Sequence, residues 1–128
     1  MNEPFTPPFH DWSSGAAAIA DELAKHAAKH DANGTFVAES YARLKAEGFF
    51  AALIPAEFGG GGASVGEMMR AIRLLGAACG STALAFAMHS HVIGINAWRW
   101  RHHQAPTDSM LKQVAAEGLI MVSSGGSD

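Results

Sequence analysis

The longest apolar stretch of the sequence, Thr82 to Trp98, restricts the fold more than any other segment. It is apolar on nearly every side of a helix, which is typical of the central helix of a bundle. It falls short of a membrane span and carries polar residues such as His89 and His91 in its middle. We therefore expect an all-α bundle around this helix and no membrane span. Close approach of neighbouring helices is favoured by its small residues, Ala83, Ala85, Ala87, Gly94 and Ala97.

Four further segments combine an apolar repeat of helical spacing with cap and stop signals, so the sequence predicts about five helices. These segments are residues 15–33 after a Ser13 or Ser14 cap, 36–47 between Thr35 and Gly48, 65–79 after Ser64, and 108–117 after Pro106. Ser64 and Glu67 have the spacing of a capping box. The expected core positions are Ile19, Leu23, Ala27, Val37, Tyr41, Leu44, Met68, Ile72, Leu75, Cys79, Met110, Leu111 and Val114.

The second and third helices are joined by an apolar connector, residues 49–55, and by four glycines, Gly59 to Gly62. Glycines before a helix can cradle a phosphate on free backbone N–H groups. However, no Lys-Ser or Lys-Thr pair follows them, and the three-glycine dinucleotide spacing after a strand is missing. We interpret the glycines as a flexible turn that leads into the capping box.

The carboxyl end changes character at residue 119. Residues 119–124 have the pattern of a short buried strand, and no other segment offers a partner strand. The sheet that would pair with it is expected beyond Asp128 or in another chain, which suggests a fragment. We divide the sequence into a proline-rich arm (1–14), a helical domain (15–118) and the start of a β-domain (119–128).

Composition limits the class of function. A formal charge of −3 and a pI near 6.1 argue against a nucleic-acid-binding domain. A single cysteine, Cys79, excludes an internal disulfide and a zinc site made of cysteines. The first residues have three prolines and an acid where a secretory signal needs basic and apolar residues. We expect a cytoplasmic protein.

The seven histidines raise the question of a metal site. His26 and His30 share a helix face that looks solvated. His89 and His91 cannot share one, and at least one of them is expected to be a hydrogen-bonded core histidine. We therefore expect no metal site. The carboxylates fall on polar faces, in loops or at helix ends, so no catalytic base is visible.

Three motifs in this order resemble the amino-terminal helical domain of the acyl-CoA dehydrogenase family. Residues 48–60, from Gly48 through Pro55 to Gly59-Gly60, are similar to its Gly–apolar–Pro–Gly-Gly signature. The helix from Met69 to Gly80 followed by residues 81–90 is similar to the next landmark, where a histidine commonly sits as His89 does. Residues 118–128 resemble the start of the family's middle β-domain, although its Thr-Glu-Pro is absent.

The resemblance implies a flavoenzyme that removes a proton and a hydride from neighbouring carbons of an acyl-CoA thioester, the hydride going to FAD. It implies a dimer or tetramer, with the catalytic glutamate in a carboxy-terminal bundle that this chain lacks. No catalytic residue is therefore expected in residues 1–128. Ser123 or Ser124 would contact the flavin, and Ser127 would lie beside the thioester chain. The acyl pocket would be walled by the helices around Phe86, Met88 and His89.

Two alternatives remain open at the level of sequence. The spacing between the strand and Gly-Ser-Asp is about two residues shorter than the family's. A flavin-dependent monooxygenase of the same fold, using reduced FMN or FAD, is therefore one alternative. The other is a stand-alone helical interaction module without the chemistry.

Overall fold

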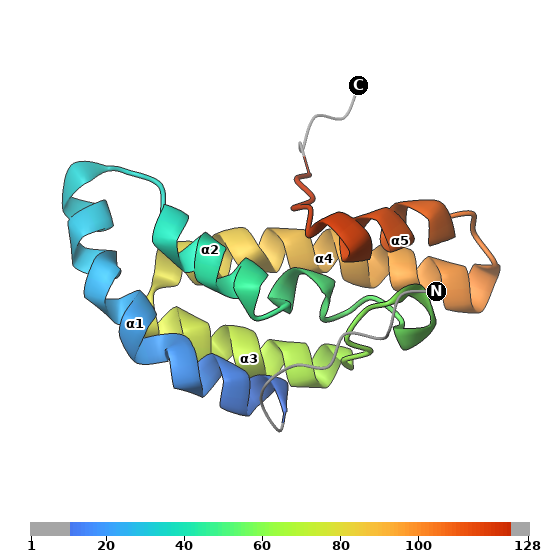
Figure 1. Cartoon of the computed structure of the whole chain (residues 1–128), viewed down its shortest axis with the longest axis horizontal. Helices are drawn as coiled ribbons and strands as arrows, with labels where there is room; N and C mark the ends of the chain where they lie inside the picture. The colour runs from blue at the N-terminus through green and yellow to red at the C-terminus, as the bar shows by residue number, and fades with distance from the viewer. Residues whose placement is uncertain (1–10, 124–128) are drawn as a thin grey trace.

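The computed structural model describes residues 11–123 and is helical, without a strand in that range (Figure 1). This confirms the predicted all-α class. The elements are α1 (Trp12–Asn33), α2 (Ala38–Ala46), η1 (Phe49–Ala51), η2 (Ala56–Phe58), α3 (Val65–Ala78), α4 (Gly80–His103) and α5 (Asp108–Glu117), where η marks a single 3₁₀ turn. Within the described range, no helix is long and apolar enough to cross a membrane.

The helices pack as two neighbouring pairs. α1 lies along α3, α5 packs on the carboxyl half of α4, and α3 packs against α4 to join the pairs (Figure 1). The larger apolar cluster draws on α1, α2, η1, α3 and the first half of α4. Its centre is aromatic: the ring of Phe49 contacts those of Trp12 and Phe86, with centroids 5.2 and 6.0 Å apart. A second cluster joins Ile93 and Ala97 of α4 to Leu111 and Val114 of α5.

Two predicted helix caps are wrong. α1 begins at Trp12, inside the predicted arm, because the Asp11 carboxylate accepts a hydrogen bond from the Ser14 backbone N–H at 2.7 Å. Thr35 does not cap α2, because its hydroxyl lies 2.6 Å from the His30 ring. α2 begins at Ala38 without a side-chain cap. Residues 1–10 of the predicted arm lie outside the described residues.

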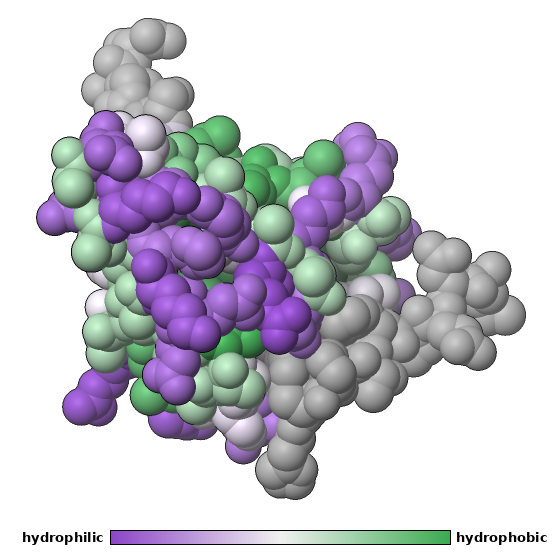
Figure 2. All heavy atoms as spheres, turned by 60° about the vertical axis from the view of Figure 1, so that its left-hand side comes forward, coloured by the Kyte–Doolittle hydropathy of each residue, from purple (hydrophilic) through white to green (hydrophobic). Residues whose placement is uncertain are grey.

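His30, which was expected to be solvated, is buried. Its Nδ1 faces Thr35 and its Nε2 lies 2.5 Å from a Glu39 carboxylate oxygen. Further ion pairs join α1 and α2, such as Arg43 to Glu22 at 3.1 Å. Figure 2 brings this end of the molecule forward and shows a broad hydrophilic area broken by apolar patches. The His30 contacts thus connect the end of α1 to the start of α2.

The glycine segment forms a close-packed loop rather than a flexible turn. The backbone N–H groups of residues 60–63 donate to the carbonyls of Pro55, Ala51, Ile54 and Ala52, in that order, at 2.8–3.2 Å. A Cβ on Gly60 would lie 2.3 Å from the Ile54 carbonyl oxygen, so a side chain there cannot fit. The N–H groups that a phosphate cradle needs are already used. The Ser64–Glu67 capping box that follows is present, as predicted.

α4 is longer than predicted, and one of its sides is exposed. We define its inner face as Phe86, His89, Ile93 and Ala97, and its outer face as Leu84, Met88, Ile95 and Trp98. The inner face is buried, whereas Leu84 is 69% exposed and Trp98 is 52% exposed. The sequence predicts the central helix of a bundle, and α4 does pack against α3 and α5, but in the described part of the chain the neighbouring elements leave its outer face open.

The predicted terminal strand is not formed in the described residues. Residues 119–123 belong to no helix or strand, and Val122 is 85% exposed. A strand needs a partner for its backbone N–H and C=O groups, and the described helices offer none. That this segment begins a β-domain stays a prediction.

Candidate functional site

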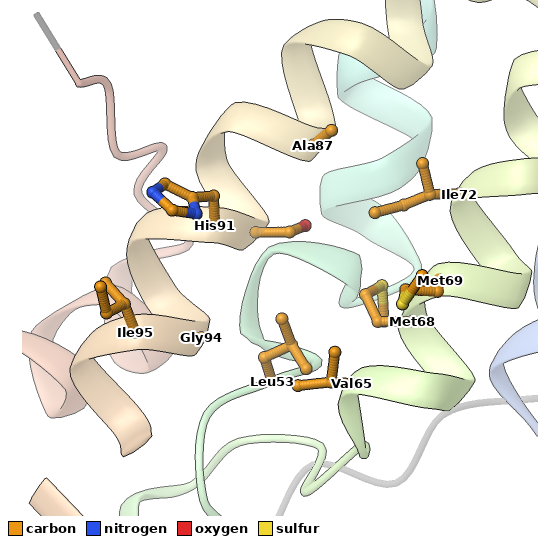
Figure 3. Close-up of a pocket in the computed structure, with 10 residues that line it drawn as sticks. Leu53, Val65, Met68, Met69, Ile72, Ala87, His91, Gly94 and Ile95 are labelled. Atoms are coloured by element: carbon orange, nitrogen blue, oxygen red, sulfur yellow. The ribbon is translucent and has the colours of Figure 1, made fainter. Parts of the chain in front are cut away.

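An apolar groove lies on the surface between α3 and α4, with a cavity volume of about 380 Å³ (Figure 3). We call it the α3–α4 groove. Figure 3 shows the α3 side chains and Leu53 lying opposite the α4 residues. The lining residues are Leu53, Val65, Met68, Met69, Ile72, Ala87, Ser90, His91, Gly94 and Ile95. Apolar and flexible methionine side chains suit an apolar ligand of variable shape.

Small residues on α4 leave room for this groove. Ala87 and Gly94 are seven residues apart, two helical turns, so they lie on one side of α4. A Cβ on Gly94 would lie 3.6 Å from the Leu53 Cδ1, an ordinary contact distance. Larger side chains at these two positions would extend across the groove toward α3. The groove therefore depends on the small side chains of α4 as much as on the apolar side chains of α3.

His89 and His91 occupy different environments, as the sequence predicts. His91 is exposed at the groove. His89 is buried, and its Nε2 lies 2.7 Å from the Phe50 carbonyl oxygen while its Nδ1 lies 2.9 Å from the Met121 backbone nitrogen. Burial lowers the pKa of His89, and the bond to the Phe50 carbonyl opposes this shift. His89 is thus a core histidine with both ring nitrogens hydrogen-bonded.

Comparisons with known proteins decide the family. Residues 13–98 match the model of the acyl-CoA dehydrogenase N-terminal domain, which is well over half of the chain. The chain belongs to the acyl-CoA dehydrogenase family. It resembles YdbM of Bacillus subtilis, whose name assigns it to the acyl-CoA dehydrogenases, with 39% identity over 83 residues, or 65% of this chain and 22% of YdbM. No solved structure is similar enough to match.

A second relative carries a different activity in its name. L-evernosamine nitrososynthase of a Micromonospora species is 29% identical over 126 residues, which is 95% of this chain and 30% of that protein. The chain therefore spans between about a fifth and a third of the length of these two relatives. The family match of this chain therefore does not by itself assign the reaction of the whole protein.

The residues predicted to wall an acyl pocket do not share one cavity. Phe86 and His89 lie together in the core, with ring centroids 6.2 Å apart, and Met88 lies on the outer face. The α3–α4 groove is lined by other residues of the same helix. Ser123 is exposed at the end of the described chain, and Ser124 and Ser127 lie outside it. The roles proposed for these residues stay predictions.

Sequence reasoning missed the groove residues Leu53, Met69 and His91. A partial signal was available, because Ala87 and Gly94 stand among the small residues of α4 that permit close approach. The sequence does not indicate which helix lies opposite Ala87 and Gly94. Among the described residues, no group of three His, Cys, Asp or Glu side chains could hold a metal ion.

Proposed function

We propose that the chain forms the amino-terminal helical part of a flavoenzyme that oxidises an acyl-CoA thioester, removing the α-proton and passing the β-hydride to FAD. Family membership supports the reaction class. The observation that carries the proposal is the α3–α4 groove, because an acyl chain needs an apolar channel of this kind. Each CH₂ group buried there would contribute about 0.8 kcal/mol to binding.

The groove would bind the acyl chain of the substrate and would not supply the catalytic base. None of its lining residues within the described range carries a carboxylate, so proton removal requires a base from another part of the enzyme. The proposed enzyme is therefore inactive as residues 1–128 alone. We also propose that it assembles as a dimer or tetramer.

The proposed flavin contact lies at the carboxyl end of the described residues. Ser123 is exposed, and the segment that carries it is held to α4 by the hydrogen bond between Met121 and His89. In this proposal Ser123 contacts the flavin ring, Ser124 is the neighbouring candidate, and Ser127 lies nearer the thioester. When bound, the flavin would supply the two-electron acceptor.

Anaerobic titration of the full-length holoenzyme with acyl-CoA thioesters tests the reaction. The visible absorbance of the oxidised flavin should be lost without oxygen or an added reductant. If a series of straight-chain acyl-CoA substrates leaves the flavin oxidised, the dehydrogenase proposal is wrong.

The groove is tested separately with Gly94→Leu, which places a branched side chain beside Leu53. This variant should raise the KM for long acyl chains more than for short ones. Gly66→Leu adds the same side chain at an exposed position of α3 outside the groove lining, and is the matched control. Equal kinetics for the two variants at every chain length would remove the groove from substrate binding.

A flavin-dependent monooxygenase is the second candidate, because the relative whose match extends over 95% of this chain is named a nitrososynthase. A nitroso group formed from an amine requires oxygen to be added to nitrogen. Such an enzyme would consume oxygen with externally reduced flavin and an amine substrate. It would not lose flavin absorbance with acyl-CoA. Oxygen uptake measured beside the anaerobic titration separates the two candidates.

A further inference from the structure

His89 joins three segments that are far apart in the sequence. It belongs to α4, its Nε2 lies 2.7 Å from the Phe50 carbonyl oxygen in η1, and its Nδ1 lies 2.9 Å from the Met121 nitrogen. The side chain is 1% exposed and lies between the rings of Phe50 and Phe86, at centroid distances of 5.3 and 6.2 Å. Aromatic packing therefore fixes the ring plane, and the two bonds fix its orientation within that plane.

These partners permit one protonation state. A backbone carbonyl only accepts hydrogen bonds, so Nε2 must carry the hydrogen and donate to Phe50. A backbone N–H only donates, so Nδ1 must keep its lone pair and accept from Met121. A protonated ring would present a second N–H to the Met121 N–H. The geometry therefore selects the neutral ring with its hydrogen on Nε2.

The bond to Met121 holds a segment that has no regular structure of its own. Residues 119–123 follow α5 without forming a helix or strand, and the side chains of Leu119, Ile120 and Val122 are exposed. The Met121 side chain packs against the apolar cluster of α4 and α5. His89 adds a hydrogen bond to that packing. Because a hydrogen bond is directional, it fixes the orientation of the Met121 backbone and so the direction in which the following residues run.

We propose that His89 is a positioning residue: as the Nε2–H tautomer it fixes Met121 on α4 and so sets where Ser123, two residues later, meets the cofactor. This inference rests on the proposed function for the contact between Ser123 and the flavin. The fixing of Met121 itself depends only on the contacts described above. The two parts can therefore fail separately.

A pair of substitutions separates the two bonds of His89. The side-chain oxygen of Asn reaches about as far as Nδ1, so His89→Asn can keep an acceptor for the Met121 N–H. The side-chain nitrogen of Gln reaches about as far as Nε2, so His89→Gln can keep a donor to the Phe50 carbonyl. Each variant retains one bond of the original pair. His102→Gln, at an exposed position of the same helix outside the groove lining, is the matched control.

Hydrogen exchange of the Met121 amide in the full-length protein is the first readout. His89→Gln should speed this exchange about tenfold, as expected for the loss of one hydrogen bond. His89→Asn and His102→Gln should leave it near the wild-type rate. Equal exchange in the two His89 variants would overturn the proposal. So would nitrogen chemical shifts of the wild-type protein showing the hydrogen on Nδ1, a measurement that does not depend on whether any variant folds.

Retention of FAD through gel filtration is the second readout. His89→Gln should lose more FAD than His89→Asn, and His102→Gln should match the wild type. If Met121 exchange separates the variants while all retain FAD equally, the positioning of the cofactor contact is wrong. Failure of the proposed reaction would instead appear in the wild-type protein, as a flavin that acyl-CoA does not reduce.

Discussion

The two faces of α4 differ in burial in a way that their hydropathy does not indicate. The inner face contains a histidine and an alanine beside Phe86 and Ile93, and it is buried. The outer face contains Leu84, Met88, Ile95 and Trp98, and it is exposed. Of these two sets of four residues, the more apolar one is thus the exposed one in the described chain.

This difference shows what a run of apolar residues can and cannot specify. A helix that is apolar all round is predicted to be buried, but the pattern does not say which partner covers each side. Here the neighbouring helices cover the side on which Phe86 contacts Phe49 and Ile93 joins the α5 cluster. The inner face is buried because its side chains fit the neighbouring elements and because His89 finds hydrogen-bond partners there.

The largest effect is expected from removing the central ring of the inner face. Phe86→Ala should lower the free energy of unfolding by about 3–5 kcal/mol, because the fully buried side chain leaves a cavity. Leu84→Ala, on the outer face two residues earlier, should change it by less than about 0.5 kcal/mol. Urea unfolding of both variants measures the difference. Similar losses would mean that the two faces are equally buried in solution.

Acid should lower the free energy of unfolding over a pH range that is set by His89 on the inner face. Burial lowers the pKa of His89 from its ordinary value of 6.5, so the folded chain keeps the ring neutral while the unfolded chain binds a proton. Stability from this group is complete above about pH 6.5 and falls as the pH drops from there toward the folded pKa. The free energy of unfolding of His89→Asn, measured at several pH values across this range, should depend less on pH than that of the wild type. An unchanged pH dependence of the free energy of unfolding would contradict the conclusion that His89 is buried as a neutral ring.

A second acid window belongs to Glu39, far from α4. Hydrogen bonds from its own backbone amide and then from His30 lower its pKa from 4.5 to about 2. The stability it contributes is therefore present above pH 4.5 and is lost as the pH falls toward 2. Glu39→Gln should remove the pH dependence of the free energy of unfolding between pH 4.5 and about 2 and leave the titration of His89 unchanged. If Glu39→Gln changes the titration of the His89 ring itself, followed by its NMR signals, the two sites are coupled.

Local signals in the sequence predicted most of the helices. The Ser64–Glu67 capping box and the glycine stop at Gly48 are short-range patterns, and both are present. The errors come from competition that local patterns do not show. Thr35 could cap α2, but His30 takes its hydroxyl, and Asp11 caps α1 ahead of Ser13 and Ser14.

The site was less predictable because its contacts are long-range. His89 bonds to residues 39 positions earlier and 32 positions later, and no spacing in the sequence encodes that pairing. The α3–α4 groove likewise needs two helices at a definite separation, whereas the small residues Ala87 and Gly94 reveal only one of them. The apolar surroundings predicted that at least one of His89 and His91 would be a hydrogen-bonded core residue. They did not indicate which of the two it would be, nor which backbone groups it would bond.

A smaller, stabilising effect is expected at Gly94, which lies at the groove between the two faces. Gly94→Ala should raise the free energy of unfolding by about 0.5–1 kcal/mol, because alanine loses less conformational entropy than glycine inside a helix. The new Cβ would meet the Leu53 Cδ1 at 3.6 Å, an ordinary contact. Thermal unfolding measures the gain. A loss of stability would show that Leu53 packs more closely against α4 than the structure describes.

The smallest effect is expected on the outer face itself, and it tests the comparison most directly. Met88→Gln preserves side-chain length and helix propensity, so it changes little besides polarity. Because Met88 is 43% exposed, the free energy of unfolding of residues 1–128 should change by less than about 0.5 kcal/mol. Urea unfolding measures this change. A loss above about 1 kcal/mol would mean that another part of the chain or a second copy covers the face, which would remove the contrast between the two sides of α4.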